Sequence, residues 1–319
     1  MRIAVLGPGA LGSVLAILFH EAGLPVVLVD YRPERAARLQ GEGLLFRPPE
    51  GAARRVFLPV CPAAQAGVAE LVLVTVKAPA TPAAARLLPG LLAPGGVVLT
   101  LQNGLGNLER LAEVVGWERL LAGVSFLGAT RPREGEVILA GTGPTYLGAP
   151  PGSRVRREEQ EAVAGLFRQA SLPCEVREDI EAMLWEKLLV NVAINPLTAL
   201  LRVQNGVLPQ LPPAWEVAVA AAREAQAVAR AQGLDLPADP EARVRQVCAA
   251  TAANRSSMLQ DVLAGRETEI AALNGEVATR GAALGVPTPV NALLTRLVQA
   301  LTLARPQQVD REGRGPEAH

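Results

Sequence analysis

The feature that most constrains this chain is a glycine-rich turn close to its N-terminus. Gly7-Pro8-Gly9-Ala10-Leu11-Gly12 follows a short β-prone run and precedes an apolar helical stretch, after which a second apolar strand ends at Asp30. Glycines at this spacing permit a tight turn, approach of the backbone to a pyrophosphate and close helix–strand packing, and the helix N-terminus supplies unpaired amides. The motif alone is a weak signal, but in this strand–turn–helix–strand context it predicts a dinucleotide site.

Two further apolar strands, at 70–76 and 96–101, end at Lys77 and at Gln102-Asn103-Gly104. Near-continuously apolar strands that alternate with helices predict the α/β class, with a parallel, doubly wound Rossmann sheet. Ligands bind such sheets outside the carboxyl ends of the strands, which makes Lys77 and Asn103 candidate contacts. Strand-like pieces at 123–126 and 135–139 are expected to run antiparallel and to extend or close the same sheet.

The sequence pattern changes near residue 178, and long segments of helical pattern, rich in Ala and Leu, follow. A chain of 319 residues suits two domains, and we predict a dinucleotide-binding domain at 1–175 and a helical substrate domain at 176–304. The polar tail, 305–319, is expected to be frayed. The predicted helices span 179–195, 214–232, 239–264, 267–284 and 288–303.

Composition excludes several classes of protein. Thirty-one basic residues balance 31 acidic ones, which argues against nucleic-acid binding. Charge, Gly or Pro interrupts the apolar stretches before about 18 residues, so no membrane span is expected, and the N-terminus lacks the regions of a signal peptide. Three cysteines, far apart, suit a reducing, cytoplasmic location and offer no zinc spacing.

The rare residue types are equally informative. The chain has two histidines, one of them the last residue, which argues against a His-based triad or a His-ligated metal. Its cations are 29 Arg and two Lys. A desolvated lysine can lose a proton near neutral pH and a guanidinium cannot, so the two lysines are functional candidates. The alternative is that Arg has replaced Lys throughout the chain without selection, and that these two lysines remain by chance.

Lys187, Asn191 and Asn195 recur every four residues in an otherwise apolar segment and form one stripe if the segment is helical. Buried polar groups of this kind need a ligand or partner to satisfy them. The alternative is an ordinary solvent-facing stripe, but Asn competes with the helical backbone and is a poor filler for one. With two of the chain's eight Asn beside one of its two Lys, we favour a functional site.

A second polar cluster comprises Asn254, Ser257, Asp261 and Glu269, which share one broad sector if a single helix carries them. Gly265 could instead end that helix and leave Glu269 in the first turn of the next one. Glu269 would then be an acid favoured by the helix dipole, and Ser256 and Ser257 could be ordinary exposed hydroxyls.

Together these motifs resemble those of the 2-dehydropantoate 2-reductase (ketopantoate reductase) family, over roughly residues 1–304. The resemblance implies an N-terminal Rossmann domain and an all-helical C-terminal domain of the 6-phosphogluconate-dehydrogenase-like type. The segments that carry it are Gly7-Pro8-Gly9-Ala10-Leu11-Gly12-Ser13, Thr75-Val76-Lys77-Ala78, Gln102-Asn103-Gly104, Trp185-Glu186-Lys187-Leu188, Asn191 to Thr198, and Ser256-Ser257-Met258-Leu259-Gln260-Asp261 with Thr268-Glu269-Ile270.

The resemblance also implies roles for individual residues. Lys187 matches the family's general acid, and Glu269 matches an acid that contacts both substrate and cofactor. Substrate contacts match Asn103, Asn191, Asn195, Asn205, Asn254 and Ser257, and cofactor contacts match Gly7 to Gly12, Lys77 and Asn103. The implied reaction is reduction of 2-dehydropantoate to (R)-pantoate, on the route to pantothenate and coenzyme A, by a monomer or a homodimer that binds no metal.

Two rival interpretations stay open at this level. One is a nicotinamide-dependent reductase of another α-keto acid. The other is a non-catalytic nucleotide sensor on the same fold. Lys187 and the adjacent Asn stripe argue against a sensor, because a sensor needs no proton donor.

Cofactor choice depends on the end of the second strand. An acid there, Asp30, commonly binds the adenosine ribose and favours NADH, whereas Arg32 and Arg35 could pair with the 2′-phosphate of NADPH. The family usually uses NADPH with an Arg in this region, often without a neighbouring acid. We predict NADPH, on the expectation that two arginines outweigh one carboxylate free to turn toward solvent.

Overall fold

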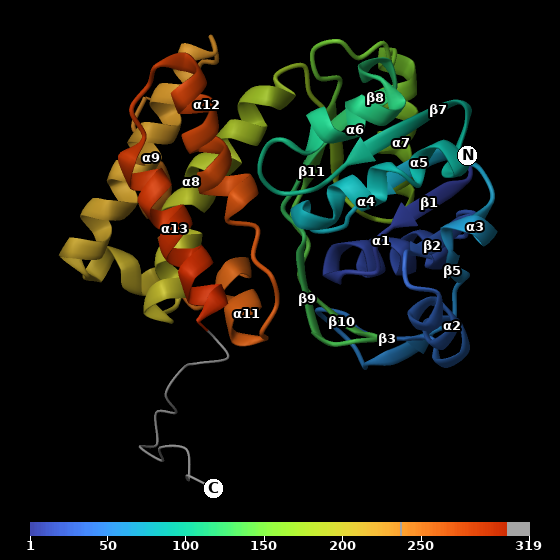
Figure 1. The fold of residues 1–319 in the computed structure, drawn as a ribbon. Helices are drawn as coiled ribbons and strands as arrows, with labels where there is room; N and C mark the ends of the chain where they lie inside the picture. Colours follow the sequence, from blue (N-terminus) through green and yellow to red (C-terminus); the bar gives the residue numbers. More distant parts are fainter. Residues whose placement is uncertain (237, 305–319) are drawn as a thin grey trace, which may run out of the picture. The chain divides into compact units, whose positions relative to one another are not determined.

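The computed structural model describes residues 1–236 and 238–304, so the predicted frayed tail lies outside the described residues. The chain divides into two compact units, residues 1–184 and the part from Trp185 onward (Figure 1). This division falls inside helix α8 (Ile180–Leu201), later than the predicted boundary. The first turn of α8 belongs with the first unit because Ile180 packs there against Ala122 and Val124.

The first unit is built on an eight-stranded sheet of order β12-β11-β8-β7-β6-β1-β2-β5. Neighbouring strands from β5 through β8 pair in parallel, and only the β8–β11 pair is antiparallel. The prediction of a parallel Rossmann-like sheet is therefore confirmed. The strands are β1 (Ile3–Leu6), β2 (Val26–Asp30), β5 (Val60–Pro62), β6 (Ala69–Val74), β7 (Leu92–Thr100), β8 (Leu120–Ser125), β11 (Thr145–Gly148) and β12 (Cys174–Val176).

Helices cover both faces of this sheet because its strands are apolar on both sides. Ile3 and Val5 of β1 belong to one core cluster and Ala4 and Leu6 to the other. On the first face lie α1 (Ala10–Glu21) and α7 (Arg157–Gln169), whose Phe19 and Phe167 rings meet edge to face at 5.2 Å. The second face carries α3 (Ala63–Ala66), α4 (Thr81–Ala85), α5 (Leu88–Leu91) and α6 (Asn107–Val115), and η1 (Ala78–Ala80) and η2 (Trp117–Arg119) are single turns.

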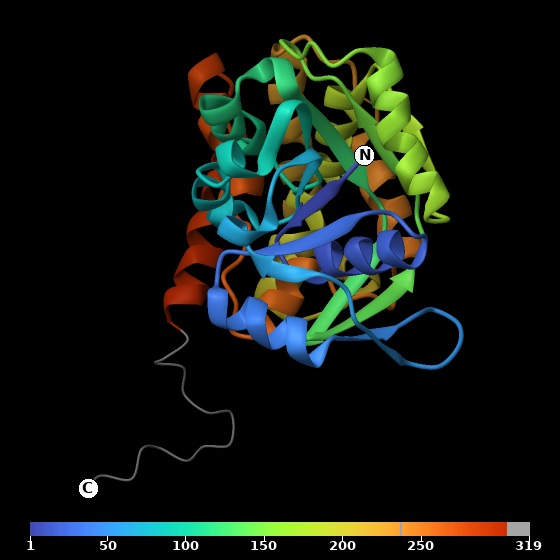
Figure 2. The same ribbon diagram turned by 90° about the vertical axis from the view of Figure 1, so that its right-hand side faces the viewer.

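A second, four-stranded sheet has the order β4-β3-β10-β9 and packs on the outer side of α1 (Figure 2). The prediction that 123–126 and 135–139 run antiparallel and extend or close the main sheet is confirmed in part for the first segment and is wrong about the sheet of the second. β8 extends the main sheet and pairs antiparallel with β11 and parallel with β7, whereas β10 pairs antiparallel with β9 in the separate sheet. The elements involved are α2 (Pro33–Glu42), β3 (Leu44–Arg47), β4 (Arg54–Val56), β9 (Gly128–Arg133) and β10 (Glu136–Gly141).

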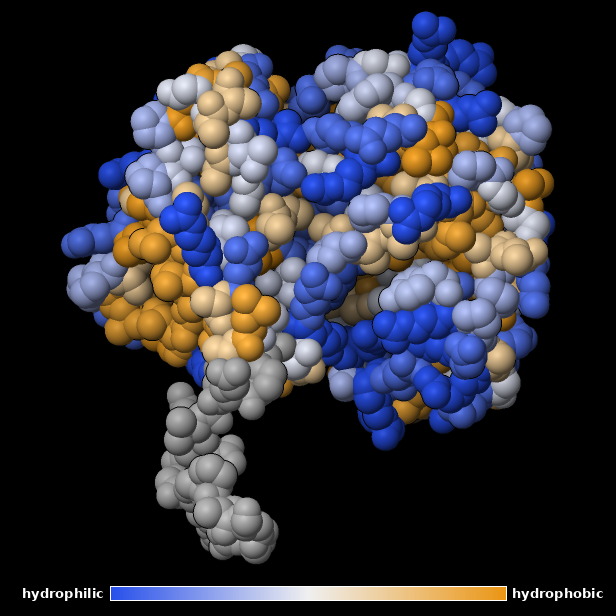
Figure 3. Space-filling view, viewed as in Figure 1, coloured by the Kyte–Doolittle hydropathy of each residue, from blue (hydrophilic) through white to orange (hydrophobic). Residues whose placement is uncertain are grey.

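The described part of the second unit is all helical, as predicted. The predicted helix 239–264 is in fact two helices separated by 251–256, and the predicted 179–195 helix continues past Pro196. The face shown in Figure 3 carries a hydrophobic patch on this unit, and hydrophobic side chains are also exposed on the first unit. Its elements are α8, η3 (Asn205–Gln210), α9 (Pro212–Ala231), α10 (Pro240–Ala250), α11 (Ser257–Leu263), the π-helical turn η4 (Ala271–Gly275), α12 (Glu276–Leu284) and α13 (Pro289–Leu303).

Helix α8 corrects one expectation about apolar stretches. It is the one helix among the described residues that is long and apolar enough to cross a membrane by length and composition. However, 67% of its apolar window is buried inside the protein, which is typical of a core helix. We therefore interpret α8 as a core helix of the protein.

Candidate active site

The glycine turn has the geometry that close backbone approach requires. Gly7 has a φ of +116°, and a side chain at Gly12 would place its Cβ 2.1 Å from the Gly7 carbonyl oxygen. Neither position accepts another residue without rearrangement. A Cβ at Gly9, in contrast, would meet only the Thr75 carbonyl, at 3.8 Å. The turn thus leaves open space at Gly9, the residue immediately before α1.

The N-terminal end of α1 has the features of an anion-binding site. Its N-cap, Gly9, provides no side-chain cap, and its first turn contains no acidic residue. The Ser13 hydroxyl is buried there without a hydrogen-bond partner among the described residues. Free amides, the positive end of the helix dipole and an unsatisfied hydroxyl fit the pyrophosphate of a dinucleotide. This arrangement agrees with the predicted contacts at Gly7 to Gly12, which stay a prediction.

Asp30, at the carboxyl end of β2, is not free to turn toward solvent, contrary to expectation. Its side chain is 0% exposed and accepts hydrogen bonds from the Arg32 amide at 3.0 Å and from the Arg35 guanidinium, with Arg35 Nη2 at 2.7 Å. Burial favours this pairing because an isolated buried carboxylate would be costly. Arg35 is therefore engaged by Asp30, whereas Arg32 is exposed, with its guanidinium 5.3 Å from the centre of the Tyr31 ring.

Lys77 and Asn103 follow two strands that pair in parallel, β6 and β7. Gln102 Nε2 donates to the Val76 carbonyl at 2.9 Å, which fastens the two segments to each other. Lys77 is exposed, and the Asn103 carbonyl accepts a bond from Asn107 Nδ2 at 3.1 Å. Both candidates thus leave the same edge of the sheet as the glycine turn, where dinucleotides bind this fold.

In the second unit, α8 carries the predicted polar stripe. Lys187 and Asn191 are partly buried and Asn195 is 6% exposed, with apolar neighbours such as Leu188 and Val192 fully buried around them. The stripe is therefore not the solvent-facing surface of an ordinary amphipathic helix. A ligand that bound here would meet one ammonium group and amides that add no charge.

Burial lowers the pKa of Lys187 from its usual 10.5 to about 8, and the Glu269 carboxylate partly offsets this effect by raising it. Removal of the ammonium from water is thus the larger cause. The carboxylate whose charge acts on the lysine is that of Glu269, which is far from Lys187 in the sequence. A lysine with a pKa near neutral pH can hold a proton and also give it up during a reaction.

Asn254 and Ser257 lie on an exposed segment that is held against α8. Thr198 of α8 and Ser256 lie 2.7 Å apart, oxygen to oxygen, and both are buried. Ser256 also caps α11, because its Oγ accepts from the Leu259 amide at 3.1 Å. The two serines therefore have different surroundings, and only Ser257 is exposed. The alternative that Ser256 is an ordinary exposed hydroxyl is wrong, because it is buried; Ser before an apolar helix is a recognisable N-cap signal. Sequence reasoning assigned no separate role to Thr198.

Asn205 supports the segment of Asn254. Its amide nitrogen in the main chain donates to the Asn254 carbonyl at 3.0 Å, and its Nδ2 donates to Thr251 Oγ1 at 2.9 Å. The side chain is 7% exposed, and its Oδ1 is buried without a partner among the described residues. The structure thus brings Asn205 and Asn254 together, with Oδ1 as the one atom of the Asn205 side chain left for a further contact.

Glu269 stands at the start of a new helical segment, because α11 ends before Gly265, which has a φ of +66°. The turn is held by Arg266 Nε, which pairs with buried Asp261 at 3.0 Å. The Glu269 carbonyl accepts the amides of Ala272 and Leu273. Glu269 is therefore a helix-start acid, as one alternative proposed, and it is also the charge that acts on Lys187.

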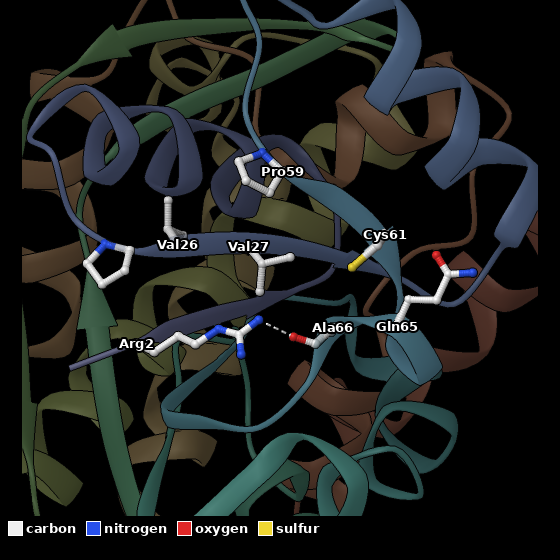
Figure 4. Close-up of a pocket in the computed structure, with 8 residues that line it drawn as sticks. Arg2, Val26, Val27, Pro59, Cys61, Gln65 and Ala66 are labelled. Atoms are coloured by element: carbon white, nitrogen blue, oxygen red, sulfur yellow. Dashed lines mark hydrogen bonds between the residues drawn. The ribbon is translucent and has the colours of Figure 1, made fainter.

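A cavity of about 330 Å³ in the first unit is not part of this site (Figure 4). It is lined by Arg2, Val26 and Val27, which lie at the amino ends of the strands, opposite to the edge where dinucleotides bind. Burial raises the pKa of the Cys61 thiol in its wall, so this cysteine is not an activated nucleophile. In residues 1–236 and 238–304 no three His, Cys, Asp or Glu side chains gather as a metal site.

A Rossmann-like domain whose glycine turn fits a dinucleotide, followed by a helical domain with a lysine of lowered pKa, defines a nicotinamide-dependent oxidoreductase. Comparison with known proteins agrees. The sequence model of the family "Ketopantoate reductase PanE/ApbA" matches residues 3–152, and that of its C-terminal domain matches residues 179–302. The chain belongs to the ketopantoate reductase family.

Individual relatives cover nearly the whole chain. The 2-dehydropantoate 2-reductase of Archaeoglobus fulgidus is 39% identical over 94% of this chain and 97% of its own length. Among solved structures, 2-dehydropantoate 2-reductase from Geobacter metallireducens superposes with a TM-score of 0.86 at 31% identity, covering 94% of this chain and 99% of that one. D-mandelate dehydrogenase with NADH and anilino(oxo)acetate has a TM-score of 0.89 at 25% identity, covering 97% and 100%.

Proposed function

We propose that this chain reduces 2-dehydropantoate to (R)-pantoate with NADPH. The observation that carries the proposal is Lys187, whose pKa is about 8 and which shares one face of α8 with Asn191 and Asn195. The family and its curated relatives supply the substrate, because the relatives from Archaeoglobus fulgidus and Halobacterium salinarum are named for this reaction. A keto acid needs a proton donor at its carbonyl oxygen and uncharged donors for its other oxygens, and this stripe offers both.

In this reaction a nicotinamide supplies hydride to the C2 carbonyl of the substrate. Lys187 polarises that carbonyl as ammonium and donates its proton as the alkoxide forms. The amides of Asn191 and Asn195 orient the substrate oxygens without competing with the lysine for charge. Glu269 keeps Lys187 protonated near neutral pH, because its carboxylate raises a pKa that burial alone would lower further. The amides that begin α1, together with the space at Gly9, would hold the pyrophosphate of the dinucleotide.

A steady-state assay of 2-dehydropantoate reduction tests the proposal. We expect turnover with a kcat/KM in the usual range for enzymes, roughly 10⁴ to 10⁸ M⁻¹ s⁻¹, and little activity on smaller α-keto acids that lack the substrate's hydroxyl. Binding of dinucleotide without turnover on any keto acid would contradict the proposal and favour a nucleotide sensor.

The likeness to D-mandelate dehydrogenase favours a second candidate, a reductase of an α-keto acid with a bulkier side chain. Both candidates use the same lysine chemistry and differ in the substrate's side chain. A panel that contains 2-dehydropantoate and benzoylformate separates them, because the true substrate should have the higher kcat/KM by about 10²-fold or more.

The proposal includes NADPH because of the charges at the end of β2. The Asp30 carboxylate is neutralised by Arg35 and buried, so it neither reaches a ribose hydroxyl nor repels a 2′-phosphate strongly. Arg32 stays exposed next to it, above the Tyr31 ring, where it can pair with a phosphate. The net local charge therefore favours the phosphorylated cofactor, although one arginine and not two supplies the attraction.

For this cofactor preference we expect Arg32→Ala to lower kcat/KM for NADPH about tenfold and to change kcat/KM for NADH little, because only NADPH carries the 2′-phosphate. Arg38→Ala is the matched control, since Arg38 is also an exposed arginine, lies within α2 and pairs with Glu134. A wild-type preference for NADH that Asp30→Ser reverses would show instead that the acid governs the pocket.

For Glu269 we expect Glu269→Ala to raise KM and lower kcat for the keto acid, each by about tenfold, because a substrate hydrogen bond and the support of Lys187 are lost together. Since Glu269 raises the Lys187 pKa, its removal should also move the basic limb of the kcat/KM profile to lower pH. Glu267→Ala, at an exposed acid two positions away, is the control. A loss of thermal stability alone would leave Glu269 as a helix-start acid only.

A cytoplasmic location is part of the same proposal. It is supported by the three cysteines, Cys61, Cys174 and Cys248, which are all free thiols. Burial raises the pKa of Cys174 to about 12 and that of Cys248 to about 11, so these two stay protonated and unreactive at neutral pH. Such thiols persist without special protection in a reducing compartment.

A further inference from the structure

Helix α8 contains a proline at position 196, one residue after the polar stripe ends. A proline has no amide hydrogen, so the carbonyl four residues earlier, that of Val192, loses its helical partner. Val192 is 0% exposed, and water cannot easily replace the missing bond. Asn274 supplies it, because its Nδ2 donates to the Val192 carbonyl at 3.0 Å.

Asn274 is itself placed by the segment that carries Glu269. It lies in the π-helical turn η4, which begins at Ala271, two residues after Glu269. The turn is closed by the Gly275 amide, which donates to the Ile270 carbonyl at 3.0 Å. π-helical turns of this kind are rare and frequently occur at functional sites. One side chain therefore joins the backbone of α8, beside Asn191, to the turn that follows Glu269.

The opposite side of Asn274 is anchored in a buried network. Its Nδ2 also donates to Asn291 Oδ1 at 2.9 Å, and Asn291 Nδ2 donates to Glu224 Oε2 at 2.7 Å. Asn274 and Asn291 are both 0% exposed. Both described bonds of the Asn274 side chain are made by Nδ2, and Oδ1 has no partner among the described residues. A buried amide oxygen without a partner is unfavourable, so the donor atom is the part of this residue that matters.

We propose that Asn274 is a positioning residue for the reaction: through the Val192 carbonyl it fixes α8 against the Glu269 turn and so sets how Lys187 and the Asn stripe face the keto acid. The proposal rests on the proposed function of the same site. It requires no direct contact of Asn274 with the substrate. Small displacements of catalytic groups cost much activity, because the reacting atoms must be aligned within fractions of an ångström.

The test compares Asn274→Ala and Asn274→Asp with wild type on the keto acid that wild type reduces best. The aspartate has nearly the same shape but as a carboxylate offers no donor to the Val192 carbonyl. We expect both variants to lose at least tenfold in kcat for the keto acid, with KM raised, while the Kd for the dinucleotide stays within about twofold. The result does not depend on which keto acid is the substrate, so failure of the proposed function is seen separately, in the wild-type panel.

Asn291→Ala is the matched control, because it removes a fully buried amide from the same network but no bond to α8. We expect it to lower the free energy of unfolding, as Asn274→Ala does, while kcat for the keto acid changes less than about threefold. An equal loss of kcat in Asn274→Ala and Asn291→Ala would overturn the proposal, since activity would then follow stability alone.

Pro196→Ala provides a second, substrate-independent readout. It restores the amide hydrogen at position 196, so the Val192 carbonyl regains a helical partner and Asn274 becomes dispensable for stability. We expect Asn274→Ala to destabilise the Pro196→Ala protein less than wild type, whereas kcat for the keto acid is not recovered in the double variant. If the two changes in the free energy of unfolding were strictly additive, the Asn274–Val192 bond would not be the replacement for the helical hydrogen bond that Pro196 removes.

Discussion

Lys187→Ala is expected to lower kcat for 2-dehydropantoate reduction by at least about 10²-fold, with little change in dinucleotide affinity. The lysine is the one group on the polar face of α8 that can give up a proton near neutral pH, because its pKa is about 8. The dinucleotide turn lies in the first unit and α8 beyond Leu184 in the second, so binding of the cofactor should persist. Single-turnover kinetics with a saturating dinucleotide would measure the chemical step directly.

Lys187→Arg is the more discriminating variant. It keeps the positive charge, but a guanidinium is too basic to release its proton, so turnover should stay as low as in the alanine variant. In wild type, kcat/KM should fall as the pH rises through about 8, because the acid must be protonated before the reaction. An arginine variant with near-normal turnover, or a wild-type profile flat from pH 7 to 10, would remove Lys187 from the role of acid.

Lys187→Met is expected to make the folded protein more stable while it abolishes activity. The lysine's pKa is about 8 when folded and near 10.5 when unfolded, so the folded state binds this proton more weakly. Below pH 8 that difference destabilises the wild type by up to about 3 kcal/mol, and the penalty disappears as the pH rises from 8 to 10.5. The variant's advantage in denaturant unfolding should therefore be largest at pH 7 and small at pH 10.

Lys77→Met is the control that the chain itself offers, since Lys77 is the second of its two lysines and is exposed. Its replacement should change the free energy of unfolding by less than about 0.5 kcal/mol at either pH. If Lys187→Met were no more stable than Lys77→Met at pH 7, the ammonium of Lys187 would be hydrated, and the reason for its lowered pKa would be gone.

Much of the site could be predicted because its signals are local in sequence. The glycine turn is read from six consecutive residues, and its steric demands at Gly7 and Gly12 appear in the structure as expected. The stripe of Lys187, Asn191 and Asn195 follows from the helical period alone, which is why its common face was predictable.

What could not be predicted depends on partners far apart in the chain. The Asn274–Val192 hydrogen bond joins residues 82 positions apart. Nothing in the local sequence around Asn274 indicates that its partner is a carbonyl left without a helical donor by Pro196. The sheet that contains β10 was mistaken for the same reason, because strand periodicity shows which residues are buried and not which strand lies alongside. Arg35 was assigned to a phosphate because sequence does not show that its side chain turns back to Asp30.

The exposed position of Arg32, beside the buried ion pair at the end of β2, should make a preference for NADPH sensitive to ionic strength. Salt screens exposed charges over a Debye length of about 8 Å under physiological conditions, but screens buried pairs much less. Asp30 and Arg35 should therefore stay paired in concentrated buffer, while attraction between exposed Arg32 and a 2′-phosphate weakens. Discrimination in favour of NADPH is thus expected to depend on the medium as well as on the protein, and to be greatest in dilute solution and smaller at the salt concentration of a cell.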